Sequence, residues 1–151
     1  VLVMGLSGSG KTFLSKLLQK ELNCAWFNAD NLREMADDWD FSTSGRNRQM
    51  RRMKSLADFE SMEGRVVICD FICPTEDLRS SFGADFIIWM DTVKESKFKD
   101  TDSIFEAPKE VDIKITDWSE YNHKKIAEII KNNVSHQETY CIAAWKTAAL
   151  A

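Results

Sequence analysis

The feature that most constrains this chain is a glycine-rich stretch near its start, where Gly5 to Thr12 reads GLSGSGKT. It matches the pattern G-x-x-x-x-G-K-[ST]. An apolar run, Val1 to Met4, precedes it, and leucines at helical spacing follow it. A strand, this loop and a helix in that order are the context of a P-loop, whose backbone N–H groups surround nucleotide phosphates. The positive end of the following helix adds to that attraction. The sequence therefore predicts a phosphate-binding loop.

Each residue type in the loop has an expected role. Lys11 should reach the β- and γ-phosphates, which makes it a catalytic candidate, and the Thr12 hydroxyl should bind magnesium. The residues expected to bind the nucleotide are Gly5, Ser7, Gly8, Ser9, Gly10, Lys11 and Thr12. The expected cofactors are therefore ATP and Mg2+.

Apolar runs and amphipathic stretches alternate along the rest of the chain. The strand candidates are residues 1–4, 25–27, 66–71, 85–90 and 111–115. The helix candidates are the stretch after Lys11, residues 45–62, 76–82 and a segment from Asn122 to Asn133. This alternation predicts a three-layer α/β/α P-loop NTPase fold with a mainly parallel five-stranded sheet. Residues 92–110 are charged and lack a clear period, so a loop or mobile segment is expected there. We expect a kinase domain over 1–134 and a helical or poorly ordered tail over 135–151.

Composition excludes several classes of protein. The 151 residues fit one domain, and the net charge of −4 argues against a general nucleic-acid binder. No apolar run reaches the length of about 18 residues that a membrane span needs. The first residues also lack the basic region of a signal peptide. The four cysteines form no C-x-x-C pair, so reduced core thiols in a cytoplasmic protein are expected rather than a metal site.

Two aspartates follow predicted strands, at the end of the sheet where ligands of such folds bind. Asp70 ends an apolar run, and a carboxylate there can bind magnesium directly or through water. Asp30 follows the second strand, where it could orient an acceptor hydroxyl or accept its proton. A second role for Asp30 is that of N-cap for a helix starting at Asn31.

The helix expected over 45–62 separates its cations when residues are placed at about 100° intervals. Arg46 and Gln49 share the apolar, inward arc. The opposite, solvated face carries Arg48, Arg51 and Arg52. An inward arginine is costly unless it meets an anion, so Arg46 is a candidate for binding an anionic substrate. Arg33, three residues after Asp30, can point into the same cleft.

An ordered set of further motifs resembles the adenylylsulfate kinase family. The matching stretches, after the glycine-rich loop, are Asp30 to Arg33 (DNLR), Phe41-Ser42 with Arg46 and Arg51-Arg52, Phe71 to Pro74 (FICP), and Phe98 with Asp102 and Glu106 to Pro108. The resemblance spans residues 1 to about 131. It implies transfer of phosphate from ATP to the 3′-hydroxyl of adenylylsulfate.

The resemblance also implies roles on the acceptor side. Arg33 and Arg46 would hold the phosphosulfate, and Phe41 and Phe98 would enclose the adenine, with Ile72 beside them. The full set of acceptor-binding candidates is Asp30, Arg33, Phe41, Arg46, Gln49, Ile72 and Phe98. The partner would be a small nucleotide-like molecule, and the assembly could be a homodimer.

The chain departs from the family pattern at several places. Between Asp91 and Phe98 it has room for six residues, Thr92 to Lys97, where the family has a longer basic lid. The other departures are Asn28 for an acidic residue, Gln49 for asparagine, Asp70 for a small residue and Thr101 for isoleucine. Two alternatives therefore stay open: a P-loop kinase for another acceptor (a nucleoside, nucleotide or modified base), and a nucleotide-binding regulator without transfer activity.

Overall fold

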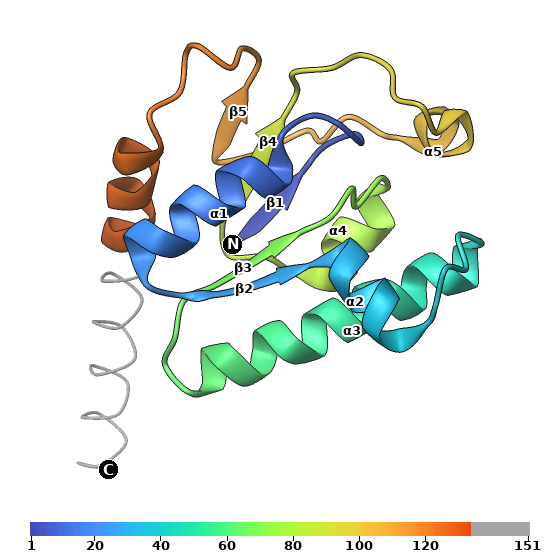
Figure 1. Cartoon of the computed structure of the whole chain (residues 1–151), viewed down its shortest axis with the longest axis horizontal. Helices are drawn as coiled ribbons and strands as arrows, with labels where there is room; N and C mark the ends of the chain where they lie inside the picture. Colours follow the sequence, from blue (N-terminus) through green and yellow to red (C-terminus); the bar gives the residue numbers. More distant parts are fainter. Residues whose placement is uncertain (134–151) are drawn as a thin grey trace.

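The structure, a computed structural model, describes residues 1–133 (Figure 1). Five strands form one sheet: β1 (Leu2–Met4), β2 (Ala25–Asn28), β3 (Val67–Asp70), β4 (Ile87–Met90) and β5 (Ile113–Ile115). Their order across the sheet is β2-β3-β1-β4-β5, and every pairing is parallel. The predicted five-stranded parallel sheet is confirmed. The expectation for residues 135–151 lies outside the described residues.

Helices cover both faces of the sheet, which makes the three layers of a P-loop fold (Figure 1). α1 (Lys11–Leu22) and a helix over residues 123–133 pack on one face. α2 (Ala29–Ala36), α3 (Thr43–Met62) and α4 (Glu76–Phe82) pack on the other.

The alternating side chains of the strands divide the core between the two faces. In β1, Leu2 and Met4 enter the core beneath α2, α3 and α4, whereas Val3 enters the core beneath α1. β1 lies between two neighbouring strands and has helices over both of its faces, so its short run is buried and wholly apolar. The loop that follows β1 therefore leaves from the middle of the sheet.

α3 begins at Thr43, two residues earlier than the pattern predicted. The Ser42 side chain accepts a hydrogen bond from the Gly45 N–H at 3.2 Å and caps the helix. Arg46 therefore ends the first turn, where its N–H donates to the Ser42 carbonyl at 2.9 Å, and it stays close to the loop that precedes the helix.

Residues 92–110 are not a loop throughout, and that expectation was wrong. They contain α5 (Lys99–Ile104), a short helix without an amphipathic pattern. Contacts from outside hold it: Thr101 is buried, and its hydroxyl accepts a hydrogen bond from Arg46 at 3.0 Å. The Asp102 carboxylate also accepts bonds from the N–H and hydroxyl of Ser96. Tertiary contacts, which periodicity does not record, therefore order this segment.

Cys24, Cys69 and Cys73 are buried free thiols, which confirms the expected core cysteines; Cys141 lies beyond the described residues. Burial raises the pKa of the Cys69 and Cys73 thiols to about 12. None of the helices within residues 1–133 is both long and apolar enough to cross a bilayer.

Candidate active site

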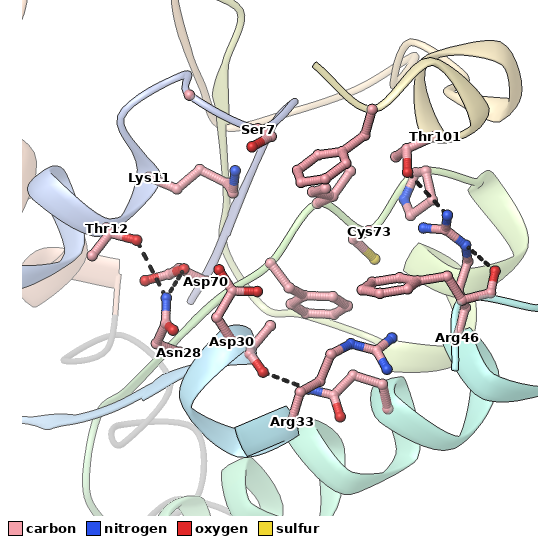
Figure 2. A pocket seen from close by; sticks show the side chains of 18 of the residues that line it. Ser7, Lys11, Thr12, Asn28, Asp30, Arg33, Arg46, Asp70, Cys73 and Thr101 are labelled. Carbon is pink, nitrogen blue, oxygen red and sulfur yellow. Dashed lines mark hydrogen bonds between the residues drawn. The ribbon is translucent and has the colours of Figure 1, made fainter. Parts of the chain in front are cut away.

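The predicted residues meet at one cavity of about 610 Å³, just beyond the carboxyl ends of β1, β2 and β3 (Figure 2). The predicted residues that line it are Ser7, Gly8, Gly10, Lys11, Thr12, Asp30, Arg33, Phe41, Arg46, Gln49, Asp70, Ile72 and Phe98. Gly5 and Ser9 are not part of the lining. The fold thus brings most of both predicted sets, nucleotide and acceptor, to one place.

Gly5 and Ser9 support the loop on the side that faces β4 and the segment after it. A Cβ on Gly5 would lie 2.5 Å from the Met90 carbonyl oxygen, so only glycine lets the loop leave β1 this close to β4. Ser9 is fully buried, and its carbonyl accepts a hydrogen bond from the Thr92 hydroxyl at 2.7 Å. The short segment after β4 therefore holds the phosphate-binding loop.

Lys11 lies at the start of α1 with its ammonium folded back into the loop. Nζ donates a hydrogen bond to the Leu6 carbonyl at 3.0 Å, and the side chain is almost entirely buried. Burial lowers its pKa to about 8, although the negative charges of Asp70 and Asp30 oppose the shift. The site therefore holds a lysine that a phosphate would return to full charge.

Asp70 is 1% exposed at the end of β3, and both of its oxygens have partners. The Trp26 indole N–H donates to Oδ2 at 2.7 Å, and the Asn28 amide donates to Oδ1 at 2.8 Å. Burial raises the pKa of this carboxyl group, against those hydrogen bonds and the charge of Lys11. The same Asn28 nitrogen donates to the Thr12 hydroxyl at 3.2 Å (Figure 2).

Asp30 is exposed and lies in the first turn of α2, on the cavity wall. The Asn28 side chain caps that helix by accepting a hydrogen bond from the Asn31 N–H at 3.0 Å. The alternative role of Asp30 as an N-cap was therefore wrong. Its carboxylate is available to a ligand.

Arg33 and Arg46 both lie close to the ring of Phe41. Their guanidinium carbons are 4.3 Å and 5.4 Å from the centre of its ring. Arg33 is buried and donates to the carbonyls of Asp38 and Asp40. The rings of Phe41 and Phe98 are about half exposed, from the loop before α3 and the residue before α5. The cavity thus joins two cations to two aromatic surfaces.

Arg46 ties α3 to α5. It donates to the Phe41 carbonyl at 2.9 Å and to the Thr101 hydroxyl at 3.0 Å, and it lies 3.7 Å from the Asp100 carboxylate. Gln49, one turn later, is buried and donates to the Ala29 carbonyl. The predicted inward face of this helix is confirmed.

The outer face of α3 follows its prediction in part: Arg48 and Arg51 are exposed, whereas Arg52 is partly buried and donates a hydrogen bond to the Gln49 side chain. Arg48 is 45% exposed and pairs with Asp38 and Asp40. Arg52 also pairs with Asp38. These arginines order the loop that carries Phe41 rather than facing the cavity.

The loop after β3 forms the remaining wall, with Ile72 and Cys73 on the cavity. Cys73 has a φ of 46°, a conformation that is strained for residues other than glycine. The Arg79 guanidinium donates to the Cys73 carbonyl at 2.9 Å and to the Glu106 carbonyl at 2.8 Å. The Glu106 N–H bonds in turn to the Pro74 carbonyl at 2.8 Å. This wall is thus tied to the segment that follows α5.

A sequence model of the family described as adenylylsulphate kinase matches residues 1–114. The chain belongs to the adenylylsulphate kinase family. Among curated proteins, the adenylyl-sulfate kinase of Shewanella sp. (strain MR-7) is 36% identical over 88 residues, which are 54% of this chain and 43% of that protein. The corresponding protein of Shewanella baltica (strain OS155) is 35% identical over the same length. The chain therefore spans less than half the length of these relatives.

Solved structures resemble this family member along most of its length. The APS kinase CysC of Mycobacterium tuberculosis, in complex with AMPPNP and APS, has a TM-score of 0.67 at 22% identity, covering 89% of this chain and 96% of that one. The shikimate kinase of Aquifex aeolicus has a TM-score of 0.56 at 16% identity, covering 91% and 97%. Identities this low show the fold alone.

Two further residues of this adenylylsulphate kinase family member, Asn28 and Trp118, contact the phosphate-binding loop, and the sequence did not predict either contact. Asn28 appeared there only as a departure from the family pattern, yet it joins Asp70 to Thr12. Trp118 follows β5 and covers Gly10, with its ring centre 6.1 Å from that of Phe13. The sequence signal available for Trp118 was a tryptophan in a polar stretch shortly after a predicted strand.

Proposed function

We propose that this chain transfers the γ-phosphate of ATP to the 3′-hydroxyl of adenylylsulfate. The observation that carries the proposal is the shared cavity, which runs from the phosphate-binding loop past Asp30 to Arg33 and Arg46. A donor on the loop and an acceptor between the arginines would therefore meet beside Asp30. Phosphoryl transfer needs mainly such positioning and charge stabilisation.

On the donor side, Lys11 and the loop N–H groups would bind the phosphates and stabilise the charge that develops on the transferring group. The residues present fit magnesium: the Thr12 hydroxyl is exposed at the loop, and Asp70 adds a negative charge behind it. Within residues 1–133 no group of three or more His, Cys, Asp or Glu side chains is placed to hold a metal. The ion would therefore also depend on the phosphates, whose charge it neutralises.

On the acceptor side, Arg33 and Arg46 would hold the anionic group, and Phe41 and Phe98 would enclose the base. Gln49 and Ile72 would line the same pocket. Asp30 would accept the proton of the 3′-hydroxyl as its oxygen bonds to the γ-phosphorus and the bond from that phosphorus to the β–γ bridging oxygen breaks. The products would be ADP and the 3′-phosphorylated acceptor.

The test is to supply ATP, Mg2+ and adenylylsulfate and to measure both ADP and the phosphorylated acceptor. A panel of nucleosides, nucleotides and modified bases is measured in parallel. Product from adenylylsulfate well above the panel supports the proposal. Product from another acceptor alone would overturn the acceptor assignment, and ATP binding without any product would favour a regulator.

One observation favours the second candidate, a kinase for another acceptor. Thr101 and Asp100 already engage the Arg46 guanidinium. An acceptor that carries less negative charge than adenylylsulfate would leave these contacts in place. The panel described above separates the two candidates.

We expect ATP affinity to fall as the pH rises through about 8. In the free protein burial lowers the pKa of Lys11 to about 8, so the ammonium is charged below this pH and neutral above it. Phosphates favour the charged form, so binding should take up a proton above pH 8. Titration calorimetry should show a roughly tenfold or greater loss of affinity between pH 7 and pH 9.5. Lys11→Arg, which stays charged, should lose this dependence; affinity that is constant to pH 9.5 in the native protein would contradict the expectation.

Arg46→Ala should raise the KM for the acceptor by roughly 10- to 100-fold, because a charged hydrogen bond to the acceptor anion is lost. The KM for ATP should stay within about twofold. Lys54→Ala is the control, since Lys54 lies on the same helix, outside the cavity lining, and pairs with Asp58. Steady-state kinetics with each substrate varied in turn measures both constants. Equal effects of the two substitutions would argue against an acceptor role for Arg46.

A further inference from the structure

The pairing of β2 with β3 places three polar side chains beside the phosphate-binding loop. Asn28 lies directly opposite Asp70 in the parallel register, and Trp26 lies two residues earlier on β2. Side chains two residues apart in a strand point to the same side of a sheet. Trp26 and Asn28 can therefore reach the same carboxylate, one for each oxygen.

The hydrogen bonds of Asn28 determine which way its amide points. Its Oδ1 accepts from the Asn31 N–H, and its Nδ2 donates to both Asp70 and Thr12. The reversed amide would place its oxygen against the Asp70 carboxylate and its NH2 against the Asn31 N–H. One orientation thus satisfies all three contacts.

This orientation leaves the Thr12 hydroxyl ready for a cation. The Asn28 amide takes one lone pair of Thr12 Oγ1, so a second lone pair stays available and the proton can turn away. Thr12 is exposed on the cavity, whereas Asp70 is 1% exposed and both of its oxygens have donors. A cation beside the phosphates would therefore meet Thr12 and not the carboxylate.

We propose that Asp70 acts on magnesium through Asn28 and Thr12, as the buried end of a hydrogen-bonded chain that orients the Thr12 oxygen, and not as a ligand of the ion. The inference rests on the proposed function, in that the chain binds ATP with magnesium. Asn28 and Asp70 are then positioning residues. Residues that orient metal ligands in this way commonly change metal affinity by roughly 10- to 100-fold when removed.

The test compares ATP affinity with excess Mg2+ and with EDTA, measured by titration calorimetry, for the native protein and two variants. Asn28→Ser keeps a good helix cap for α2 but is too short to join Asp70 to Thr12. Asp70→Asn keeps the shape and removes the charge. Both variants should reduce the gain in affinity that Mg2+ provides by roughly tenfold or more. Asn28→Ser, which keeps the Asp70 charge near Lys11, should also leave the affinity in EDTA within about twofold. Asp58→Asn, an exposed substitution on α3, controls for lost charge and should change neither value.

The two variants distinguish a positioning role of Asp70 from direct binding of the ion. Loss of the Mg2+ effect in Asp70→Asn but not in Asn28→Ser would mean that Asp70 binds the ion itself, and an unchanged effect in both would mean that neither residue acts on it. Either result overturns the inference. If Asp70→Asn does not fold, Asn28→Ser decides alone, because it retains the carboxylate and its bond to Trp26. A native protein whose ATP binding gains nothing from Mg2+ would overturn the proposed function as well.

Discussion

Replacing Asp30 by asparagine is expected to lower kcat by roughly 10²- to 10⁴-fold, the range for loss of a general base. The asparagine amide would keep the size of the side chain and would no longer accept the proton of the acceptor hydroxyl. ATP binding should stay within about threefold, because Asp30 lies in the first turn of α2 and not in the loop that would hold the phosphates. Calorimetry with ATP and a product assay at saturating substrates measure the two quantities separately.

Asp37→Asn is a suitable control for this experiment. Asp37 follows the other end of α2 with a φ of 48°, a conformation that asparagine tolerates well. Its activity should match that of the native protein. If Asp30→Asn retained more than about a tenth of the native kcat, Asp30 would not be the proton acceptor.

The second large effect is expected at Gly10. Gly10 has a φ of 99°, and a Cβ built on it would overlap the six-membered ring of Trp118. Gly10→Ala must therefore strain the backbone and displace either the loop or the indole. Strain of this kind costs about 1–3 kcal/mol. Displaced loop N–H groups should lower turnover by roughly 10²- to 10³-fold, as when a preorganised donor is lost.

Gly8→Ala distinguishes the effect of backbone strain from that of steric overlap with the Trp118 ring. Gly8 also has a positive φ, of 80°, but a Cβ on it would meet nothing within 4 Å. It should therefore be less harmful than Gly10→Ala in both urea unfolding and turnover. Adding Trp118→Ala should restore part of the activity of Gly10→Ala and none of the activity of Gly8→Ala. Equal losses at the two glycines would show that the indole is unimportant.

The parts of this site that the sequence predicts are those set by local spacing. The GLSGSGKT pattern locates the phosphate-binding loop, because its roles depend on neighbours in the chain. Placing α3 at helical angles separates Arg46 and Gln49 from Arg48, and the structure agrees. Both inferences need only one element at a time.

The parts that the sequence does not predict depend on how elements meet. Joining Asp70 to Thr12 through Asn28 requires β2 beside β3, in register, and α1 above them. Such pairings are set by the whole fold, since consecutive strands of a parallel sheet need not be neighbours. α5 was missed for a related reason, because Arg46 and Ser96 supply the contacts that hold it.

The hydrogen bonds that join α3, α5 and the loop after β3 should affect how fast an acceptor binds. Arg46 joins Phe41 to Thr101, and Arg79 joins Cys73 to Glu106, so both sides of the proposed acceptor pocket are already held by the segment that contains and follows α5. Because these walls are already ordered before binding, an acceptor that enters the pocket loses little binding free energy to ordering them. Its association should then be limited by diffusion and by charge attraction, and differences in affinity among acceptors should arise mainly in how fast they leave.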